Sequence, residues 1–452
     1  MMLLAIDWHV IGVKALQLIF SLSILVVLHE FGHYITAKWF GCRVEKFYLF
    51  FDPWFSVFKK KIKDTEYGIG WLPLGGYVKI AGMIDESMDK EQLNQPAQPW
   101  EFRSKPAWQR LIIMLAGIVV NVLLAIFIYG MMLFVWGEKY LPAKNVQYGI
   151  ATDSLARSVG LKDGDIVISV GNKDVDDFNS ITGAIVLDEA KLMTVKRDQQ
   201  IVNINLPEGT IRQIIKRKGQ PFVEPRMPFI VNKFPAVSPA EKAGLKKADK
   251  IISIDSVATP YYNDATTYLK NKKDNDISLG FIRGTDTLHK TIHVSPDGKL
   301  GIFAEGNLDS LGLVTKTKTY TFFESIPAGF SKTFEILAKY MTNLRMIFTS
   351  KEVKVSESVG GFLSIGNLFP DEWDWKSFWN LTALLSIILA FMNILPIPAL
   401  DGGHALFTII EMITGRKPSM KFMEYAQIAG MVLLLGLMLY VNGLDIFRLF
   451  NK

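Results

Sequence analysis

The feature that most constrains the fold is an uncharged apolar stretch that runs directly into a metal-binding motif. Ala15 to Leu28 contains no charged residue, and His29-Glu30-Phe31-Gly32-His33 follows at once. A helix places residues four apart on one face, so both imidazoles can reach one Zn²⁺. Glu30 then lies beside the metal, where it can take a proton from metal-bound water. The sequence therefore predicts a zinc site, with Glu30 as general base, on a helix that enters a bilayer.

Composition indicates a mixture of membrane spans and water-soluble domains. Hydrophobic residues make up 49% of the 452 residues, and the net charge is +6. The length allows two to four domains. The basic residues gather locally and no nucleic-acid-binding motif occurs, so we expect no nucleic acid partner. The single cysteine, Cys42, excludes an intrachain disulfide and a cysteine-based zinc site.

Four apolar stretches are long enough to cross a bilayer, which needs about 20 residues. They are Val10 to about Tyr34, Leu111 to Trp136, Phe378 to Leu400, and Tyr425 to Gly443. The first lacks a small-residue cleavage site, so we expect a retained transmembrane helix and not a signal peptide. Polar groups at one end of the first and third stretches mark functional positions, because they are costly in lipid.

Basic residues predict the orientation. They are dense between spans one and two, and Arg416, Lys417 and Lys421 lie between spans three and four. The positive-inside rule places both loops in the cytosol and segment 137–375 on the other side. His29 is about 28 Å of helix past Val10. His29 and the end of span three, at Leu400, are therefore expected at similar depth near the cytosolic face.

The large outer segment contains an internal repeat. Residues 154–170 parallel residues 238–254, each with a short helix, a Gly-Leu stop, an acidic turn and an alternating strand. This pattern resembles PDZ domains of the bacterial protease type, which bind peptides by adding a strand to a sheet edge. The alternative is two generic α+β domains with similar turns. The expected division is 1–136, 137–222, 223–310, 311–375 and 376–452.

Two further segments carry predictions. Phe322 to Phe348 is expected to form an amphipathic helix, either on the membrane surface or packed against the second PDZ-like domain. Residues 66–82 form two strand-like runs around Pro73-Leu74-Gly75-Gly76. We expect either a hairpin that dips toward the membrane with one edge free for an extended substrate, or an ordinary small hairpin.

A catalytic zinc site needs a third protein ligand, and Asp401 is the best candidate. It follows Asn393-Ile394-Leu395-Pro396-Ile397-Pro398-Ala399-Leu400 at the depth expected for His29, and Gly402-Gly403-His404 come next. The prolines break the helix, and the glycines permit close backbone approach. Alone, this stretch could be a helix-ending turn, but beside the first motif it favours a ligand.

The paired motifs resemble the site-2 protease family of intramembrane zinc metalloproteases, and the likeness covers essentially the whole chain. That resemblance implies zinc ligation by His29, His33 and Asp401, with Glu30 as base and Asn393 as a substrate or oxyanion contact. Gly117 and Asn121 match the family's GxxxN element, although helix packing alone would also explain Gly117. His404 is not a ligand in the family. Gly360-Gly361-Phe362-Leu363-Ser364-Ile365 lacks the family's usual proline, which leaves the local geometry there open.

The expected fold is a polytopic α-helical membrane protein with about four transmembrane helices, two tandem α+β PDZ-like domains and a membrane-associated β-hairpin. The expected activity is hydrolysis of single-span membrane proteins or signal peptides in the bacterial inner membrane, with the PDZ-like domains on the periplasmic side. Two alternatives remain: an anchored protease acting on soluble substrates, and a membrane-anchored PDZ adaptor with a non-catalytic metal site.

Overall fold

A computed structural model describes residues 7–83, 96–171, 173–216, 222–235, 238–349 and 359–450. The chain forms two compact units. The first consists of Met1–Gly137 together with Thr319–Asn451, and the second is Glu138–Lys318. The first unit is therefore assembled from the two ends of the chain, and all the predicted site residues belong to it.

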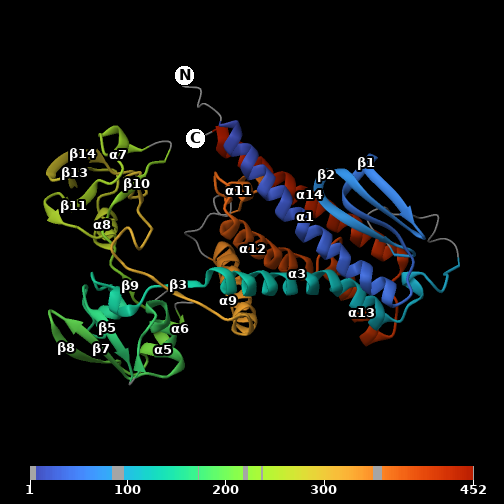
Figure 1. The fold of residues 1–452 in the computed structure, drawn as a ribbon, viewed down its shortest axis with the longest axis horizontal. Helices are drawn as coiled ribbons and strands as arrows, with labels where there is room; N and C mark the ends of the chain where they lie inside the picture. The colour runs from blue at the N-terminus through green and yellow to red at the C-terminus, as the bar shows by residue number, and fades with distance from the viewer. Residues whose placement is uncertain are drawn as a thin grey trace. The chain divides into compact units, whose positions relative to one another are not determined.

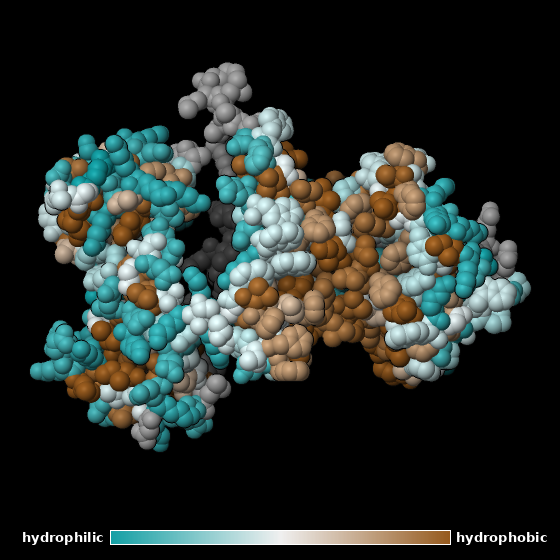
Figure 2. Space-filling model, in the orientation of Figure 1, coloured by the Kyte–Doolittle hydropathy of each residue, from teal (hydrophilic) through white to brown (hydrophobic). Residues whose placement is uncertain are grey.

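The four predicted membrane spans are confirmed as long apolar helices of the first unit. They are α1 (Trp8–Trp39), α3 (Ala107–Trp136), α12 (Trp375–Ile394) and α14 (Met420–Phe450). Helix α3 contacts α1, α12 and two further helices, α9 and α13, so it is the centre of the bundle (Figure 1). Figure 2 shows hydrophobic surface gathered over these helices, as expected for contact with lipid.

Helix α1 packs through one narrow face. Its buried residues recur every three or four positions and include Gln17, Ser21, Leu25, His29 and Gly32. Leu16, Ile19 and Phe20 on the remaining surface are exposed. The periodicity of a helix thus aims the metal motif into the bundle and leaves apolar side chains outward.

The third predicted span is shorter than expected. Helix α12 ends at Ile394, the chain turns through 395–400, and α13 (Asp401–Thr414) begins at the expected ligand. The proline positions in the turn cannot donate backbone hydrogen bonds, so the helix stops there. A Cβ on Gly402 would lie 2.3 Å from the carbonyl oxygen of Leu395. The two glycines therefore let α13 start directly against the turn.

The hairpin is larger than predicted. Strand β1 (Val44–Ile62) is joined to β2 (Thr65–Ile80) by a turn at 63–64. Residues 66–69 of β2 run alongside residues 46–49 in the same direction, and residues 76–79 run alongside them in the opposite direction. The chain therefore reverses at the Pro/Gly stretch, where Gly75 has a φ of 156°, but the two runs lie on either side of residues 46–49 and do not pair with each other. The missed partner is β1, whose aromatic and lysine residues do not alternate in the pattern of a half-buried strand.

Two segments near the bundle pack within the first unit. Helix α9 (Phe322–Thr349), predicted from its amphipathic pattern, lies along α3 and also contacts α12. A Cβ on Gly329 would be 2.5 Å from the backbone nitrogen of Gly130, so small residues set this close approach. The short helix α11 (Phe362–Gly366) is held by α14, where Asp445 accepts a 2.9 Å bond from the Ser364 N–H.

The second unit contains two sheets with the same strand order. The first sheet is ordered β6-β5-β7-β8 and the second β12-β11-β13-β14. Their strands are β5 (Ile166–Val170), β6 (Lys173–Asp174), β7 (Leu192–Arg197) and β8 (Gln200–Asn205), then β11 (Lys250–Ile254), β12 (Val257–Ala258), β13 (Asp276–Arg283) and β14 (Asp286–His293). The predicted repeat therefore corresponds to two copies of one sheet topology.

Short elements complete the two halves of this unit. The first half adds α4 (Ser154–Ser158), α5 (Ile181–Leu187), α6 (Thr210–Lys216) and a β4–β9 pair (Ile150–Ala151 with Glu224–Pro225). The second adds α7 (Pro239–Lys242), α8 (Tyr262–Leu269) and a β10–β15 pair (Val231–Lys233 with Phe303–Ala304).

Each half has its own hydrophobic core. Leu313 packs into the first core, although it follows the second half in sequence. Strand β3 (Glu138–Tyr140) pairs with β16 (Lys316–Lys318), which brings the two ends of the unit together.

Candidate metal centre

The three predicted ligands meet at one point. His29 Nε2 and His33 Nε2 lie 3.3 Å apart, and Asp401 Oδ2 is 3.2 Å from the first and 3.3 Å from the second. Both histidines are buried and come from successive turns of α1, whereas Asp401 comes from the first turn of α13. Two segments more than 360 residues apart thus supply a single triangle of donor atoms.

This triangle fits a tetrahedral zinc ion. Bonds of about 2.0 to 2.1 Å at tetrahedral angles separate ligand atoms by about 3.3 to 3.4 Å. Asp401 Oδ2 is buried and makes no hydrogen bond of its own. Two imidazoles and one carboxylate also form one of the ligand sets of catalytic zinc, which leaves a fourth position for water or substrate. The geometry and the chemistry of the donors therefore agree.

Helix α3 forms the wall behind the histidines. A Cβ on Gly117 would lie 2.4 Å from His33 Nε2 and 2.6 Å from His29 Cε1, so only glycine leaves room for both rings. His33 Nδ1 is 2.8 Å from the carbonyl oxygen of Ile113. Asn121 Nδ2 is 3.1 Å from His29 Nδ1. The GxxxN element therefore faces the metal motif directly, beyond the role of helix packing.

A cavity of about 600 Å³ opens beside these donors. It is lined by Glu30 and the three donor residues on one side and by hairpin residues such as Gly76, Tyr77 and Val78 on the other. Asn393 at the end of α12 directs its amide toward the centre, with Nδ2 3.4 Å from His29 Nε2. His404 also lines the cavity but is not among the three clustered donors.

Several supporting residues were not predicted from the sequence. Gln427 on α14 accepts a 3.1 Å bond from the Ala399 N–H, two residues before Asp401. Gly430 lies so close to Pro398 that a Cβ would overlap its carbonyl oxygen. Arg110 of α3 pairs with Glu411 of α13 at 2.5 Å, and both are buried. Gln427, a polar residue within the fourth apolar stretch, was an available signal, whereas Arg110 and Glu411 lie outside the predicted spans and offered none.

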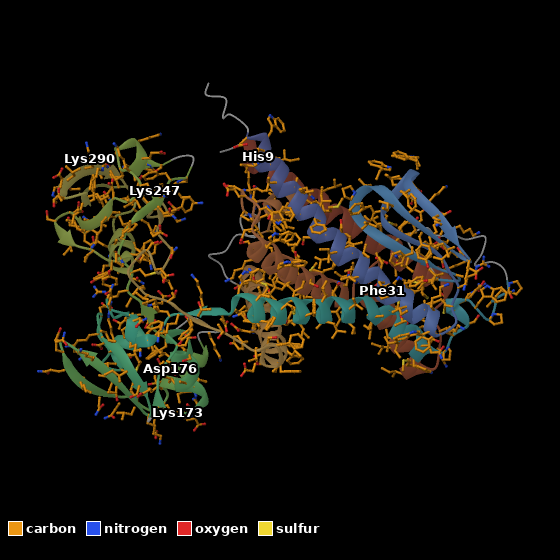
Figure 3. The ribbon with its side chains drawn as sticks, in the orientation of Figure 1. His9, Phe31, Lys173, Asp176, Lys247 and Lys290 are labelled. Carbon is orange, nitrogen blue, oxygen red and sulfur yellow. The ribbon has the colours of Figure 1, made fainter. Side chains whose placement is uncertain are left out.

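His9 and His293 lie away from the three clustered donors. His9 stands on the first turn of α1, whereas Phe31 marks the motif further along the same helix (Figure 3). His293 is exposed on β14 between Asp274 and Asp276. Hydrogen bonds that the ring nitrogens donate to these two carboxylates, Asp276 first, raise the pKa of His293.

Comparisons with known proteins identify the family. A model described as peptidase family M50 matches residues 17–437. The "Regulator of sigma E protease" of Haemophilus influenzae is 26% identical over 456 residues, covering 95% of this chain and 98% of that relative. The "Regulator of sigma-E protease RseP" of Salmonella typhimurium is 28% identical over 464 residues, covering 96% and 97%. With the family match over most of the chain and a donor set that fits zinc, this protein is an intramembrane zinc metalloprotease and belongs to peptidase family M50.

Proposed function

We propose that His29, His33 and Asp401 hold the catalytic zinc and that Glu30 is the general base. The observation that carries this assignment is the convergence of three donor atoms, 3.2 to 3.3 Å apart, from the membrane helix α1 and the first turn of α13. Glu30 belongs to the same turn as both histidines and lines the cavity that opens at the donors. Its carboxylate is therefore in position to serve a water molecule held at the centre.

Peptide hydrolysis follows from these groups. When bound, zinc lowers the pKa of a water ligand and polarises the scissile carbonyl. Glu30 takes the proton from that water and later delivers it to the amine nitrogen of the leaving peptide. The Asn393 amide, which points into the centre, donates a hydrogen bond to the carbonyl oxygen as negative charge develops on it.

The hairpin presents the substrate to these residues. A substrate helix keeps its carbonyls hydrogen-bonded, so the scissile segment must first become extended. In the β1–β2 pairing, residues 76–79 have a strand on one side only, and Gly76 lies close to Val26 and Glu30 of α1. An extended peptide can add to this edge as a further strand and place its backbone along the cavity.

The substrates in this proposal are single-span membrane proteins and remnant signal peptides. Two of the three donors belong to α1, and Asn393 lies at the end of α12, and both helices can cross a bilayer, which favours substrates delivered within the membrane. The names of the relatives point to regulation of sigma E, so anti-sigma factors are the first substrates to test. The two halves of the second unit act as PDZ-like domains that bind peptides or limit substrate size.

The same proposal assigns the two faces of the membrane. The basic loops around Lys59 to Lys63 and Arg416 to Lys421 lie in the cytosol, by the positive-inside rule. The metal centre is then near the cytosolic face of the bacterial inner membrane, and the second unit is periplasmic. The exposed Trp54, stacked on Trp71, supports a position of this part of the hairpin at the membrane interface.

The test is cleavage of a single-span reporter in detergent, with bound zinc measured in each variant. Glu30→Gln is expected to retain zinc and lose cleavage, whereas His33→Gln is expected to lose both. His9→Gln is the control because His9 lies outside the centre, and it should resemble wild type. A Glu30→Gln variant with full activity would overturn the assignment of the base. Folded wild-type protein without zinc would support the PDZ adaptor instead.

A further inference from the structure

Both zinc-binding histidines are arranged in the same way against α3. Each directs Nε2 toward Asp401 and turns Nδ1 toward the neighbouring helix. The contacts on α3 are Ile113 and Asn121, eight residues apart, so they lie on one face with Gly117 between them. One helix face thus receives the outer nitrogen of both rings.

A neutral histidine that binds a metal through Nε2 carries its proton on Nδ1. That N–H needs an acceptor, and the acceptor fixes the tautomer and the orientation of the ring. For His33, the carbonyl oxygen of Ile113 at 2.8 Å meets this need. For His29, the atom within reach is Asn121 Nδ2 at 3.1 Å, which is a donor. Two N–H groups would then face each other.

The other end of the same amide resolves this conflict. Asn121 is fully buried, and its Oδ1 has no hydrogen-bond partner. A half-turn of the side-chain amide exchanges Nδ2 and Oδ1. Either orientation leaves one end of the amide unpaired, so the number of hydrogen bonds does not decide between them. The choice between the two orientations follows from the zinc-bound state, in which Nδ1 of His29 carries a proton and needs an acceptor.

We propose that Asn121 Oδ1 accepts a hydrogen bond from His29 Nδ1 in the zinc-bound enzyme and so directs Nε2 of His29 to the metal. This inference rests on the proposed ligand set. Asn121 acts through His29 and is a positioning residue. Its backbone is fixed by Ser386 of α12, which donates a 2.7 Å bond to the Asn121 carbonyl oxygen. Burial denies the imidazole an acceptor from bulk solvent, so loss of Oδ1 leaves the Nδ1 proton unpaired.

The experiment measures zinc affinity of the full chain in detergent by competition with a chelator. Asn121→Asp presents an acceptor in both orientations, and Asn121→Leu has a similar shape without one. Thr382→Val is the matched control because Thr382 is equally buried and bonds to Ser21, outside the metal centre. The melting temperature of the metal-free protein reports folding of each variant. Cleavage of the reporter is measured alongside.

The expected result separates the acceptor from packing. Asn121→Asp should bind zinc at least as tightly as wild type, and Asn121→Leu about 10- to 100-fold more weakly. Thr382→Val should lower the melting temperature with unchanged zinc affinity. Equal affinity of Asn121→Leu and wild type would overturn the inference, and so would a folded Asn121→Asp that binds as weakly as Asn121→Leu. Wild-type protein that binds no zinc would instead overturn the proposed metal site.

Discussion

At the scale of single residues, the metal centre depends on glycines as much as on the three donor residues. Gly117 is the clearest case, because both imidazoles occupy the space that its Cβ would fill. Gly32 leaves room for the backbone of α3, because a Cβ on Gly32 would lie 2.6 Å from the Ala116 carbonyl oxygen. The close approach of α1 and α3 at these two glycines lets α3 reach the outer nitrogens of the ligands.

Gly117→Ala should therefore disturb the centre without breaking the helix. Alanine is the better helix former, so local helix stability should rise slightly. The added methyl group must displace one or both rings, and we expect cleavage to fall by roughly 100-fold, with weaker zinc binding. Gly12→Ala is the control, because a Cβ there meets nothing within 4 Å. Unchanged zinc affinity and cleavage in Gly117→Ala would show that the rings need no such space.

At the scale of helices, Asp401 is positioned by elements that carry no ligand themselves. Arg110 of α3 and Glu411 of α13 form a buried ion pair, and Arg110 Nε also donates a 3.1 Å bond to the Lys105 carbonyl oxygen. Gln427 of α14 holds the turn that precedes Asp401. The α13 helix is thus fixed at its far end by α3 and at its start by α14, so the carboxylate remains directed toward the histidines.

This ion pair predicts a non-additive double mutant. Glu411→Leu leaves the Arg110 charge buried without its partner and should destabilise the protein by about 3 to 5 kcal/mol. Arg110→Met combined with Glu411→Leu removes both charges, and most of that loss should be recovered. Melting temperatures in detergent test this. Asp188→Leu, which removes an exposed partner of Lys173, is the control and should change stability by less than about 1 kcal/mol. Additive effects at 110 and 411 would contradict the prediction.

These helix contacts also show what the sequence could not predict. The motif at 29–33, the turn at 393–403 and the four spans follow from local spacing and apolar length, and the structure forms all of them, although the third span ends at Ile394 and not at Leu400. Arg110 and Glu411 are separated by 301 positions, and no local period connects them. The central strand of the hairpin was missed for a similar reason. Gly and Pro at 73–76 reverse the chain as predicted, but residues 46–49 of β1 lie between the two runs, and no local pattern connects them.

At the scale of the whole molecule, the second unit repeats one stabilising contact in each half. Arg197 donates two 2.7 Å bonds to the buried carboxylate of Asp165, and Arg283 donates bonds of 2.8 and 2.6 Å to Asp249. Each arginine also bonds to the carbonyl oxygen of the glycine that ends the preceding helix segment, Gly160 or Gly244. The two halves thus share an ion pair to a buried carboxylate as well as a sheet order.

The second unit should fold when residues 138–318 are expressed alone. It has two hydrophobic cores, and its first and last strands pair with each other, so its ends need no support from the membrane unit. A cooperative denaturant transition of this fragment is the expected result. A fragment without protected amide protons would show instead that the unit requires the membrane helices.

The free energy of unfolding of that fragment should depend on pH through the carboxylate of Asp249. Burial alone would raise the pKa of Asp249, but hydrogen bonds from the Arg283 guanidinium and the Lys246 N–H outweigh it and hold the pKa below its usual value. A carboxylate with a lowered pKa contributes stability that is complete above about pH 4, its unfolded pKa, and is lost as the pH falls through the folded pKa.

Asp249→Asn should therefore destabilise the fragment at pH 7, and its difference from wild type in free energy of unfolding should shrink below about pH 4. Asp174→Asn, at an exposed position, is the control and should unfold at nearly the same urea concentration as wild type at pH 7. Urea unfolding of the three proteins from pH 7 to pH 3 measures this, and a difference between wild type and Asp249→Asn that stays constant with pH would rule out the ionised carboxylate as its source.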